Sequence, residues 1–267
     1  MEKEGSPEQF ADVRRHVGFL ERREGLADLL ERLLGYPAVR DAFVNGDGEE
    51  DLFDAVARRL GLTVEVSGDE TVIPRTGPVV YVANHGHGGA DALALMGMMC
   101  RHRDDVRVLA NREVMHLRGV GPYVFPVAVM TESSANENTG SLRGMLKHLR
   151  QGGCLGVFPA GRVAYWQGDR MADPPWNNHV VKLLQRLEAT IVPVWFHGNP
   201  PAAINLLSKL SPFLRTALIP TGLAWMRGRT VSARIGEPFP SGDLRAQGEE
   251  GVDWLRARLQ SLQEKGN

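Results

Sequence analysis

The sequence is poor in cysteine, with Cys100 and Cys154 as its two thiols. Both lie inside apolar runs, and they do not show the spacing of metal ligands. Disulfides stabilise proteins of oxidising compartments, whereas isolated cysteines in apolar segments are typical of buried free thiols in a reducing one. We therefore expect no disulfide bond.

The sequence also lacks the apolar runs that carry a chain into or across a membrane. Its first residues, Met-Glu-Lys-Glu-Gly, have neither the basic start nor the apolar stretch of a secretion signal. No window approaches the roughly 20 apolar residues of a membrane-spanning helix. We expect a cytoplasmic protein, and any contact that it makes with the inner face of the cell membrane must be peripheral.

Strong net charge is missing too. The net charge is -1, so no basic field favours nucleic acid as a partner. Between Glu188 and Glu237 there is no acidic residue, but there are several basic ones, namely Lys209, Arg215, Arg227, Arg229 and Arg234. Two interpretations stay open: a surface that attracts an anionic membrane or a phosphate-bearing lipid, or a solvated edge beside buried strands.

What is present fits a globular protein with a sizeable core. The 267 residues are 43% hydrophobic and 24% charged, which is ordinary for one α/β domain. In residues 1–62, apolar residues recur at helical spacing over 10–34 and again over 49–60. We expect these N-terminal amphipathic helices to pack on or beside a core domain formed by residues 63–267.

In the core, strand and helix patterns alternate along the chain. The predicted strands are residues 63–66, 79–83, 106–110, 125–130, 154–158, 190–196 and 231–235. The predicted helices are 91–100, a short one before Gly119, 141–150, 177–187 and 251–263. This order predicts an α/β fold with a mostly parallel mixed sheet flanked by helices, preceded by the N-terminal helical segment. Sites in such sheets gather where the strands' carboxyl ends meet the following loops.

The first candidate site segment is the glycine-rich turn after the strand 79–83, which runs from Asn84 to Asp91. Asp91 stands at the start of a helix, where the helix dipole favours an ionised carboxylate. Such a carboxylate holds an imidazole in one tautomer, so we interpret His85 as a general base with Asp91 as its partner, and Asn84 as a substrate contact. The alternative is that Asp91 only caps the helix and His85 is a turn residue.

Two further segments follow predicted strands. After strand 154–158, Phe158, Pro159, Gly161 and Arg162 form a proline-glycine turn that presents one guanidinium. We interpret these four residues as substrate-binding, because guanidinium suits phosphate or carboxylate and the Gly161 backbone is placed to approach an oxyanion. The segment Val-Pro-Val at 192–194 interrupts a buried strand with proline and by itself indicates no chemistry.

Arg112 follows the predicted strand 106–110 and is a further candidate. It either binds the head group of a donor or acceptor, or forms an ion pair at a helix start without a role in function. The sequence leaves both interpretations open.

The ordered set of Asn-His and Asp, then Phe-Pro-x-Gly, then Val-Pro-Val resembles the glycerolipid and lysophospholipid acyltransferase family. The resemblance covers residues 68–237 and is greatest to the hemolysin-like branch, which includes enzymes that acylate lyso-ornithine lipid. It implies a mixed α/β fold, His85 and Asp91 as the catalytic pair, and a fatty acyl group donated by acyl-carrier protein or acyl-CoA. The donor is then a co-substrate, and no cofactor or metal is expected.

The sequence departs from the commonest family pattern at two places. Five residues rather than four separate His85 from Asp91, a spacing associated with the hemolysin-like branch. The usual Phe-Pro-Glu-Gly-Thr-Arg, whose acid and arginine serve the acceptor phosphate, here reads Phe-Pro-Ala-Gly-Arg-Val. Ala160 lacks the carboxylate, and Arg162 comes one position early. A lyso-lipid with an amino-acid or other atypical head group therefore fits at least as well as glycerol phosphate.

No serine or cysteine beside a base marks a covalent nucleophile, so we expect direct attack of the acceptor on the thioester, with an ester product favoured over an amide. Two rival functions remain. His85, His87 and Asp91 are possible ligands of a metal-dependent hydrolase. Alternatively, the chain is a non-catalytic protein that binds a lipid or an acyl carrier.

Overall fold

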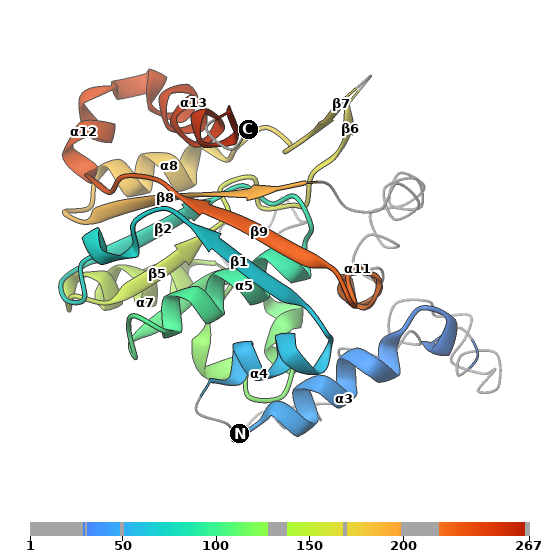
Figure 1. Cartoon of the computed structure of the whole chain (residues 1–267). Helices are drawn as coiled ribbons and strands as arrows, with labels where there is room; N and C mark the ends of the chain where they lie inside the picture. The colour runs from blue at the N-terminus through green and yellow to red at the C-terminus, as the bar shows by residue number, and fades with distance from the viewer. Residues whose placement is uncertain are drawn as a thin grey trace.

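A computed structural model describes residue 29 and residues 31–48, 51–127, 138–167, 170–198 and 219–264. Its centre is an eight-stranded sheet in the order β1-β9-β8-β2-β5-β3-β4, with β10 paired to β8 (Figure 1). The strands are β1 (Thr63–Ser67), β2 (Val79–Ala83), β3 (Val106–Asn111), β4 (Val124–Val127), β5 (Cys154–Val157), β8 (Thr190–His197), β9 (Thr230–Ile235) and β10 (Phe239–Pro240).

Most of the sheet is parallel. β2 pairs in parallel with both β5 and β8, and β3 pairs in parallel with β5 and β4. β9 and β10 run antiparallel to β8, and β1 runs parallel to β9. The predicted α/β class with a mostly parallel mixed sheet is therefore confirmed. Because five neighbouring strands share one direction, the turns after β2, β5 and β3 leave the sheet at the same edge, which we call the carboxyl edge.

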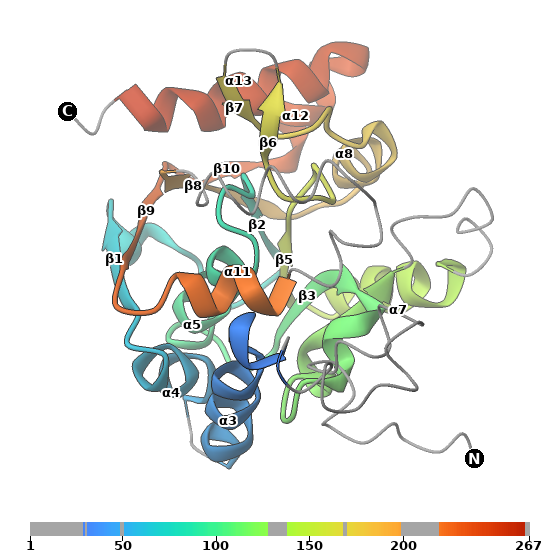
Figure 2. The same cartoon turned by 90° about the vertical axis from the view of Figure 1, so that its right-hand side faces the viewer.

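Helices cover both faces of the sheet (Figures 1 and 2). One face carries α3 (Tyr36–Gly46), α4 (Leu52–Arg59), α5 (Gly89–Cys100) and α11 (Ile219–Trp225). The other carries α7 (Thr139–Arg150), α8 (Asn178–Gln185), α12 (Ser241–Ala246) and α13 (Gly251–Glu264). Short 3-10 turns are η2 (Glu70–Val72), η3 (Arg112–His116), η4 (Gly121–Tyr123) and η5 (Gly248–Glu250).

The burial of β2 shows how the two layers arise. Every residue of β2 is buried, because side chains alternate between two covered faces of the sheet. Val79, Tyr81 and Ala83 join the core with α5, whereas Val80 and Val82 join the core with α7, α8 and α13. An uninterrupted apolar run of this length is what a central parallel strand requires.

The N-terminal helices share the α5 core. Val39 and Phe43 of α3 and Phe53 and Val56 of α4 are buried in the same cluster as β2 and α5. The predicted helix over 49–60 is present as α4, whereas the predicted helix over 10–34 lies almost entirely outside the described residues. The sequence pattern did not predict α3.

Other differences from the sequence prediction concern short elements. The hairpin of β6 (Tyr165–Gln167) and β7 (Arg170–Ala172) was not predicted, nor were α11, α12 and β10. Elements of two to seven residues are too short to show a reliable period. The strand expected at 125–130 is present as β4, with residues 128–130 outside the described part. No helix in the described ranges has the length and apolar character needed to span a bilayer.

Candidate active site

The glycine-rich turn after β2 folds back onto the start of α5. Gly88 has φ 72°, and a Cβ there would stand 3.1 Å from Val163 Cγ2, so glycine is needed for both backbone and space. Gly86 lies against the end of β8, where a Cβ would be 3.2 Å from the Gly198 carbonyl oxygen. The turn thereby brings two histidines over the first turn of α5, where Asp91 lies.

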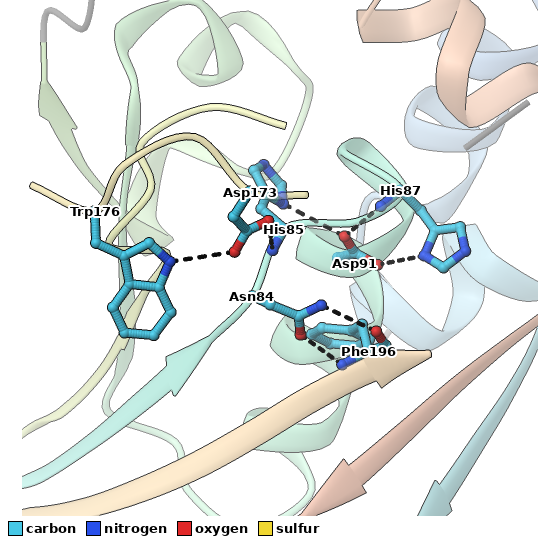
Figure 3. Close-up of polar contacts among 7 residues, drawn as sticks. All are labelled: Asn84, His85, His87, Asp91, Asp173, Trp176 and Phe196. Carbon is cyan, nitrogen blue, oxygen red and sulfur yellow. Dashed lines mark hydrogen bonds and ion pairs between the residues drawn. The ribbon is translucent and has the colours of Figure 1, made fainter. Parts of the chain in front are cut away.

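Asp91 is fully buried and is surrounded by imidazole and amide donors (Figure 3). Its Oδ2 accepts the His87 backbone N–H at 2.6 Å, and its Oδ1 lies 2.9 Å from His87 Nδ1. Burial alone would raise the pKa of Asp91, but the donors of His85 and His87 outweigh burial and hold this pKa below its ordinary value. Asp91 is thus a buried carboxylate that stays ionised.

His85 is the more accessible of the two histidines. Its side chain is 16% exposed, against 5% for His87. Nδ1 of His85 lies 3.5 Å from Asp91 Oδ2 and has no hydrogen bond within the described residues. Catalytic hydrogen bonds are often this long before substrate binds. Because Nδ1 faces Asp91, Nε2 is the ring nitrogen left to meet a substrate.

The ring and backbone of His85 are held from the β5 side of the site. The ring stacks on Phe158 with 4.2 Å between centroids and 28° between planes. The backbone N–H of His85 donates to Asp173 Oδ1 at 3.2 Å, and its carbonyl accepts the Ala164 N–H at 2.7 Å. The segment after β5 therefore fixes the position of His85. This contact agrees with the expectation that the turns after β2 and β5 lie close together.

The proline-glycine turn is closed by its own hydrogen bonds. Gly161, with φ 61°, donates its N–H to the Phe158 carbonyl at 2.9 Å, and the Pro159 carbonyl accepts the Asn177 N–H at 2.9 Å. The Gly161 amide is thus already hydrogen-bonded. The expected oxyanion role of the Gly161 backbone cannot be filled by that N–H, because it serves the turn.

Arg162 and Arg112 are both exposed at the carboxyl edge. Arg162 follows the turn after β5, and Arg112 begins η3 after β3, two strands away from β2. Within the described ranges neither guanidinium has a hydrogen bond or an ion pair.

Asn84 was predicted to contact the substrate, but its amide is used inside the protein. Nδ2 donates to the Phe196 carbonyl at 3.0 Å, and Oδ1 accepts the Phe196 N–H at 2.6 Å (Figure 3). The residue is buried. The structure thus assigns Asn84 to joining the end of β2 to β8, which positions His85 next to it.

Sequence reasoning missed Asp173. Its Oδ1 accepts the His85 N–H, and its Oδ2 accepts the Trp176 indole N–H at 3.3 Å (Figure 3). Burial raises the pKa of Asp173, and the His85 N–H only partly offsets this. Asp173 and His85 are 88 positions apart, and Asp-Pro-Pro between two tryptophans matches no motif, so no local signal identified this contact.

The ligands proposed for a metal-dependent hydrolase point at one another. Nδ1 of His87 is hydrogen-bonded to Asp91 Oδ1, and Nδ1 of His85 faces Asp91 Oδ2 at 3.5 Å, so both atoms are turned toward Asp91. In the part of the chain that the structure describes, no group of three or more His, Cys, Asp or Glu is arranged to hold a metal ion. Cys100 and Cys154 are free thiols, and burial raises the pKa of Cys154 to about 12, so it is protonated and a poor nucleophile.

Two surface pockets lie away from these residues. One of about 430 Å³ opens at the opposite edge of the sheet, between Pro78, Thr190 and Arg245. The other, of about 470 Å³, lies beside α13 at Trp254. His85 does not line either pocket, so neither is a candidate binding site for a substrate of this histidine.

A family model described as "Acyltransferase" matches residues 48–265, and the chain belongs to this acyltransferase family. Two lyso-glycine lipid O-acyltransferases are similar in sequence. One, from Bacteroides thetaiotaomicron, is 30% identical over 71% of this chain and 71% of its own length. The other, from Phocaeicola vulgatus, is 26% identical over 71% of this chain and 69% of its own length. The resemblance to glycerolipid and lysophospholipid acyltransferases is confirmed.

The fold is similar to a solved structure of the same class. The crystal structure of the 1-acyl-sn-glycerophosphate acyltransferase PlsC from Thermotoga maritima superposes with a TM-score of 0.53, at 19% sequence identity, over 96% of this chain and 91% of that one. At this identity the likeness concerns the fold alone. The protein is therefore an acyltransferase with the α/β architecture of that structure.

Proposed function

We propose that this protein transfers a fatty acyl chain from the thioester of an acyl-carrier protein or CoA to the hydroxyl of a lyso-lipid with an amino-acid head group. One observation carries the proposal: at the carboxyl edge, the accessible imidazole of His85 faces the buried, ionised carboxylate of Asp91. The similarity to two lyso-glycine lipid O-acyltransferases supports the acceptor class.

The proposed reaction is a direct transfer. Nε2 of His85 takes the proton of the acceptor hydroxyl while the oxygen attacks the thioester carbonyl carbon. The tetrahedral intermediate collapses, the carbon–sulfur bond breaks, and the thiolate leaves and takes the proton from the imidazolium. Asp91 stabilises the charged imidazolium and orients it through Nδ1. General-base catalysis of this kind contributes about 10²–10⁴-fold to the rate.

The head-group preference follows from the turn after β5. Ala160, where the usual family pattern has an acid, is buried and offers no carboxylate. Arg162 is exposed beside it, and its guanidinium fork suits the carboxylate of an amino acid as well as it suits a phosphate. A glycine-type head group with a free carboxylate therefore matches this edge.

Peripheral membrane contact and a cytoplasmic location remain part of the proposal. Arg227 and Arg229 are exposed just after α11, which fits a surface that meets anionic lipid. Lys209 and Arg215 lie outside the described residues.

The test uses purified protein with acyl-carrier-protein and CoA thioesters and a panel of acceptors. The panel contains lyso-glycine lipid, lyso-ornithine lipid and lysophosphatidic acid, with thiol release and product mass measured together. We expect thiol release with an ester product on the amino-acid lipids. No release with any acceptor would favour a binding protein, and free fatty acid made only with bound stoichiometric metal would favour a hydrolase.

Replacing the base should abolish transfer without unfolding the protein. We expect His85→Ala to lower the rate of thiol release by about 10²–10⁴-fold, because the proton acceptor is lost. The matched control is His179→Ala, which removes an exposed imidazole on α8 and should leave the rate unchanged. Circular dichroism checks the fold of both variants. Substantial activity in a folded His85→Ala protein refutes the assignment.

A further inference from the structure

The shortest side-chain contact of Asp91 is with His87 rather than with His85. His87 Nδ1 lies 2.9 Å from Oδ1, whereas His85 Nδ1 lies 3.5 Å from Oδ2. The His87 backbone N–H adds a second short contact to Oδ2 at 2.6 Å. Two imidazoles therefore share one carboxylate, and the buried one holds it more tightly.

The chemistry of the pair sets the proton positions. An ionised carboxylate only accepts hydrogen bonds, so the Nδ1 of His87 carries the proton and donates it to Oδ1. Donation to both oxygens from one residue fixes the plane of the carboxylate group. A lone pair of Oδ2 is then left for His85. Among the described residues, loss of the His87 side chain would leave Oδ1 as a buried, charged oxygen without a side-chain donor, which is costly.

His87 is poorly placed to act as the base itself. Its side chain is 5% exposed. Its Nε2 lies close to Gly198 at the end of β8, where a Cβ would stand only 3.0 Å away. Gly198 has φ 93°, so glycine is favoured there by its backbone and by the space that the ring takes. The site is built to hold this ring and leaves little room for a substrate on its Nε2 side.

We propose that His87 is a positioning residue, whose Nδ1–H keeps Asp91 ionised and turned so that Oδ2 faces His85. The inference rests on the proposed function, because it gives Asp91 a role in transfer. His87 acts through Asp91 and does not touch the substrate.

Two substitutions of His87 distinguish the effect of its hydrogen bond to Asp91 from the effect of the volume of its ring. His87→Asn places an amide N–H near the position of Nδ1, and His87→Leu fills a similar volume without a donor. We expect His87→Leu to lower kcat by about tenfold or more, with the KM values of donor and acceptor within about threefold of wild type, since one charge-assisted hydrogen bond is lost. His87→Asn should keep kcat within about threefold, because the donor remains.

A spectroscopic readout tests the same contact without activity. The titratable groups that face the Asp91 carboxylate are His85 and His87 from the preceding turn and Asp173 from the segment after β7. With carbon-13 labelled aspartate, the pKa of Asp91 should be higher in His87→Leu than in wild type, because burial is opposed by fewer donors. In His87→Asn it should stay near the wild-type value.

The outcomes decide between the inference and the proposed function. A folded His87→Leu protein with wild-type kcat and an unchanged Asp91 titration overturns the inference, as does a His87→Asn protein as impaired as His87→Leu. Should His87→Leu not fold, His87→Gln replaces it, because its amide reaches toward Nε2 instead of Nδ1. Wild-type protein without transfer to any acceptor overturns the proposed function, and the Asp91 titration then decides the role of His87 alone.

Discussion

At the scale of single residues, two carboxylates near His85 differ in their affinity for protons. Asp91 has a lowered pKa because its interactions with the His85 and His87 imidazoles outweigh its burial. Asp173 has a raised pKa because its burial outweighs the hydrogen bonds that it accepts from the His85 N–H and the Trp176 indole N–H. The ionised Asp91 also disfavours a second negative charge close by. One carboxylate is thus kept charged beside His85, and the other takes up a proton more easily.

Carbon-13 NMR of aspartate-labelled protein checks this difference. We expect the carboxyl carbon of Asp91 to titrate below the ordinary pKa of 3.8 and that of Asp173 to titrate above it. Asp91→Asn and Asp173→Asn assign the two signals. Joint titration of both groups at the ordinary value would contradict the electrostatic description of the site.

The same shifts have opposite effects on stability. The stabilising contribution of Asp91 is present above pH 3.8 and is lost as the pH falls through the lowered folded pKa. The unfavourable contribution of Asp173 is present above its raised folded pKa and is relieved as the pH falls through that pKa. A fall in pH therefore removes the stabilising contribution of Asp91 to the free energy of unfolding, and it also removes the destabilising contribution of Asp173.

At the scale of elements, the site depends on how the ends of β2 and β8 are tied together. The Asn84 amide bridges the backbone of Phe196 at the point where both strands end. The two residues are 112 positions apart. His85 follows Asn84 directly, so this bridge also determines the position of His85 at the carboxyl edge.

Removing the bridge should destabilise the fold. We expect Asn84→Ala to lower the free energy of unfolding by about 1–3 kcal/mol, because the Phe196 N–H and carbonyl lose their buried partner. The control Asn45→Ala removes an exposed amide that bonds to Asp41 and should change it by less than about 0.5 kcal/mol. Urea unfolding measures both. A large rise in the acceptor KM with unchanged stability would instead restore Asn84 as a substrate contact.

The segment between β5 and α8 is a second element that shapes the site. It holds the backbone of His85 from both sides, through the Ala164 N–H and the Asp173 carboxylate. The Gln167 side-chain amide donates to the Ala172 and Asp173 carbonyls. These bonds connect the β6–β7 hairpin to Asp173, which contacts the His85 backbone. Figure 1 shows the hairpin on the side toward which β8 points. The hairpin therefore helps to support the turn that carries His85.

At the scale of the whole molecule, the N-terminal helices and the sheet share one hydrophobic core. Phe43 of α3 is 4% exposed and lies in the cluster that includes β2 and α5. The matching family model begins at residue 48, between α3 and α4. The core thus extends to a helix that precedes the family region.

A core substitution in α3 tests this continuity. We expect Phe43→Ala to lower the free energy of unfolding by about 3–5 kcal/mol and to keep a single unfolding transition. The neighbouring control, Val44→Ala, changes a side chain that is 39% exposed and should cost less than about 0.5 kcal/mol. Denaturant unfolding followed by tryptophan fluorescence and circular dichroism measures both. Two separate transitions would show that α3 and α4 form a unit of their own.

The sequence by itself determined the α/β class, the positions of the central strands, and the two motifs that follow β2 and β5. The apolar runs 79–83 and 190–196 are mostly buried, and Gly86 and Gly198 follow them within three residues. These signals are local, because hydrophobic period and backbone preference act within a few residues. The parallel order of the strands then brings the turn of His85 and the turn of Phe158 to one edge.

Only the tertiary structure decided how the side chains at that edge are used. Asp91 makes its shortest hydrogen bonds with His87, and the Asn84 side chain bonds to the backbone of Phe196. The Gly161 N–H donates within its own turn, and the Asp173 carboxylate accepts the His85 N–H. Such contacts depend on side-chain rotamers and on which distant segments of the chain meet. Hydrogen bonds between residues 88 and 112 positions apart produce no periodic pattern in the sequence. The balance between burial and neighbouring donors, which gives Asp91 and Asp173 opposite pKa shifts, likewise exists only after the chain has packed.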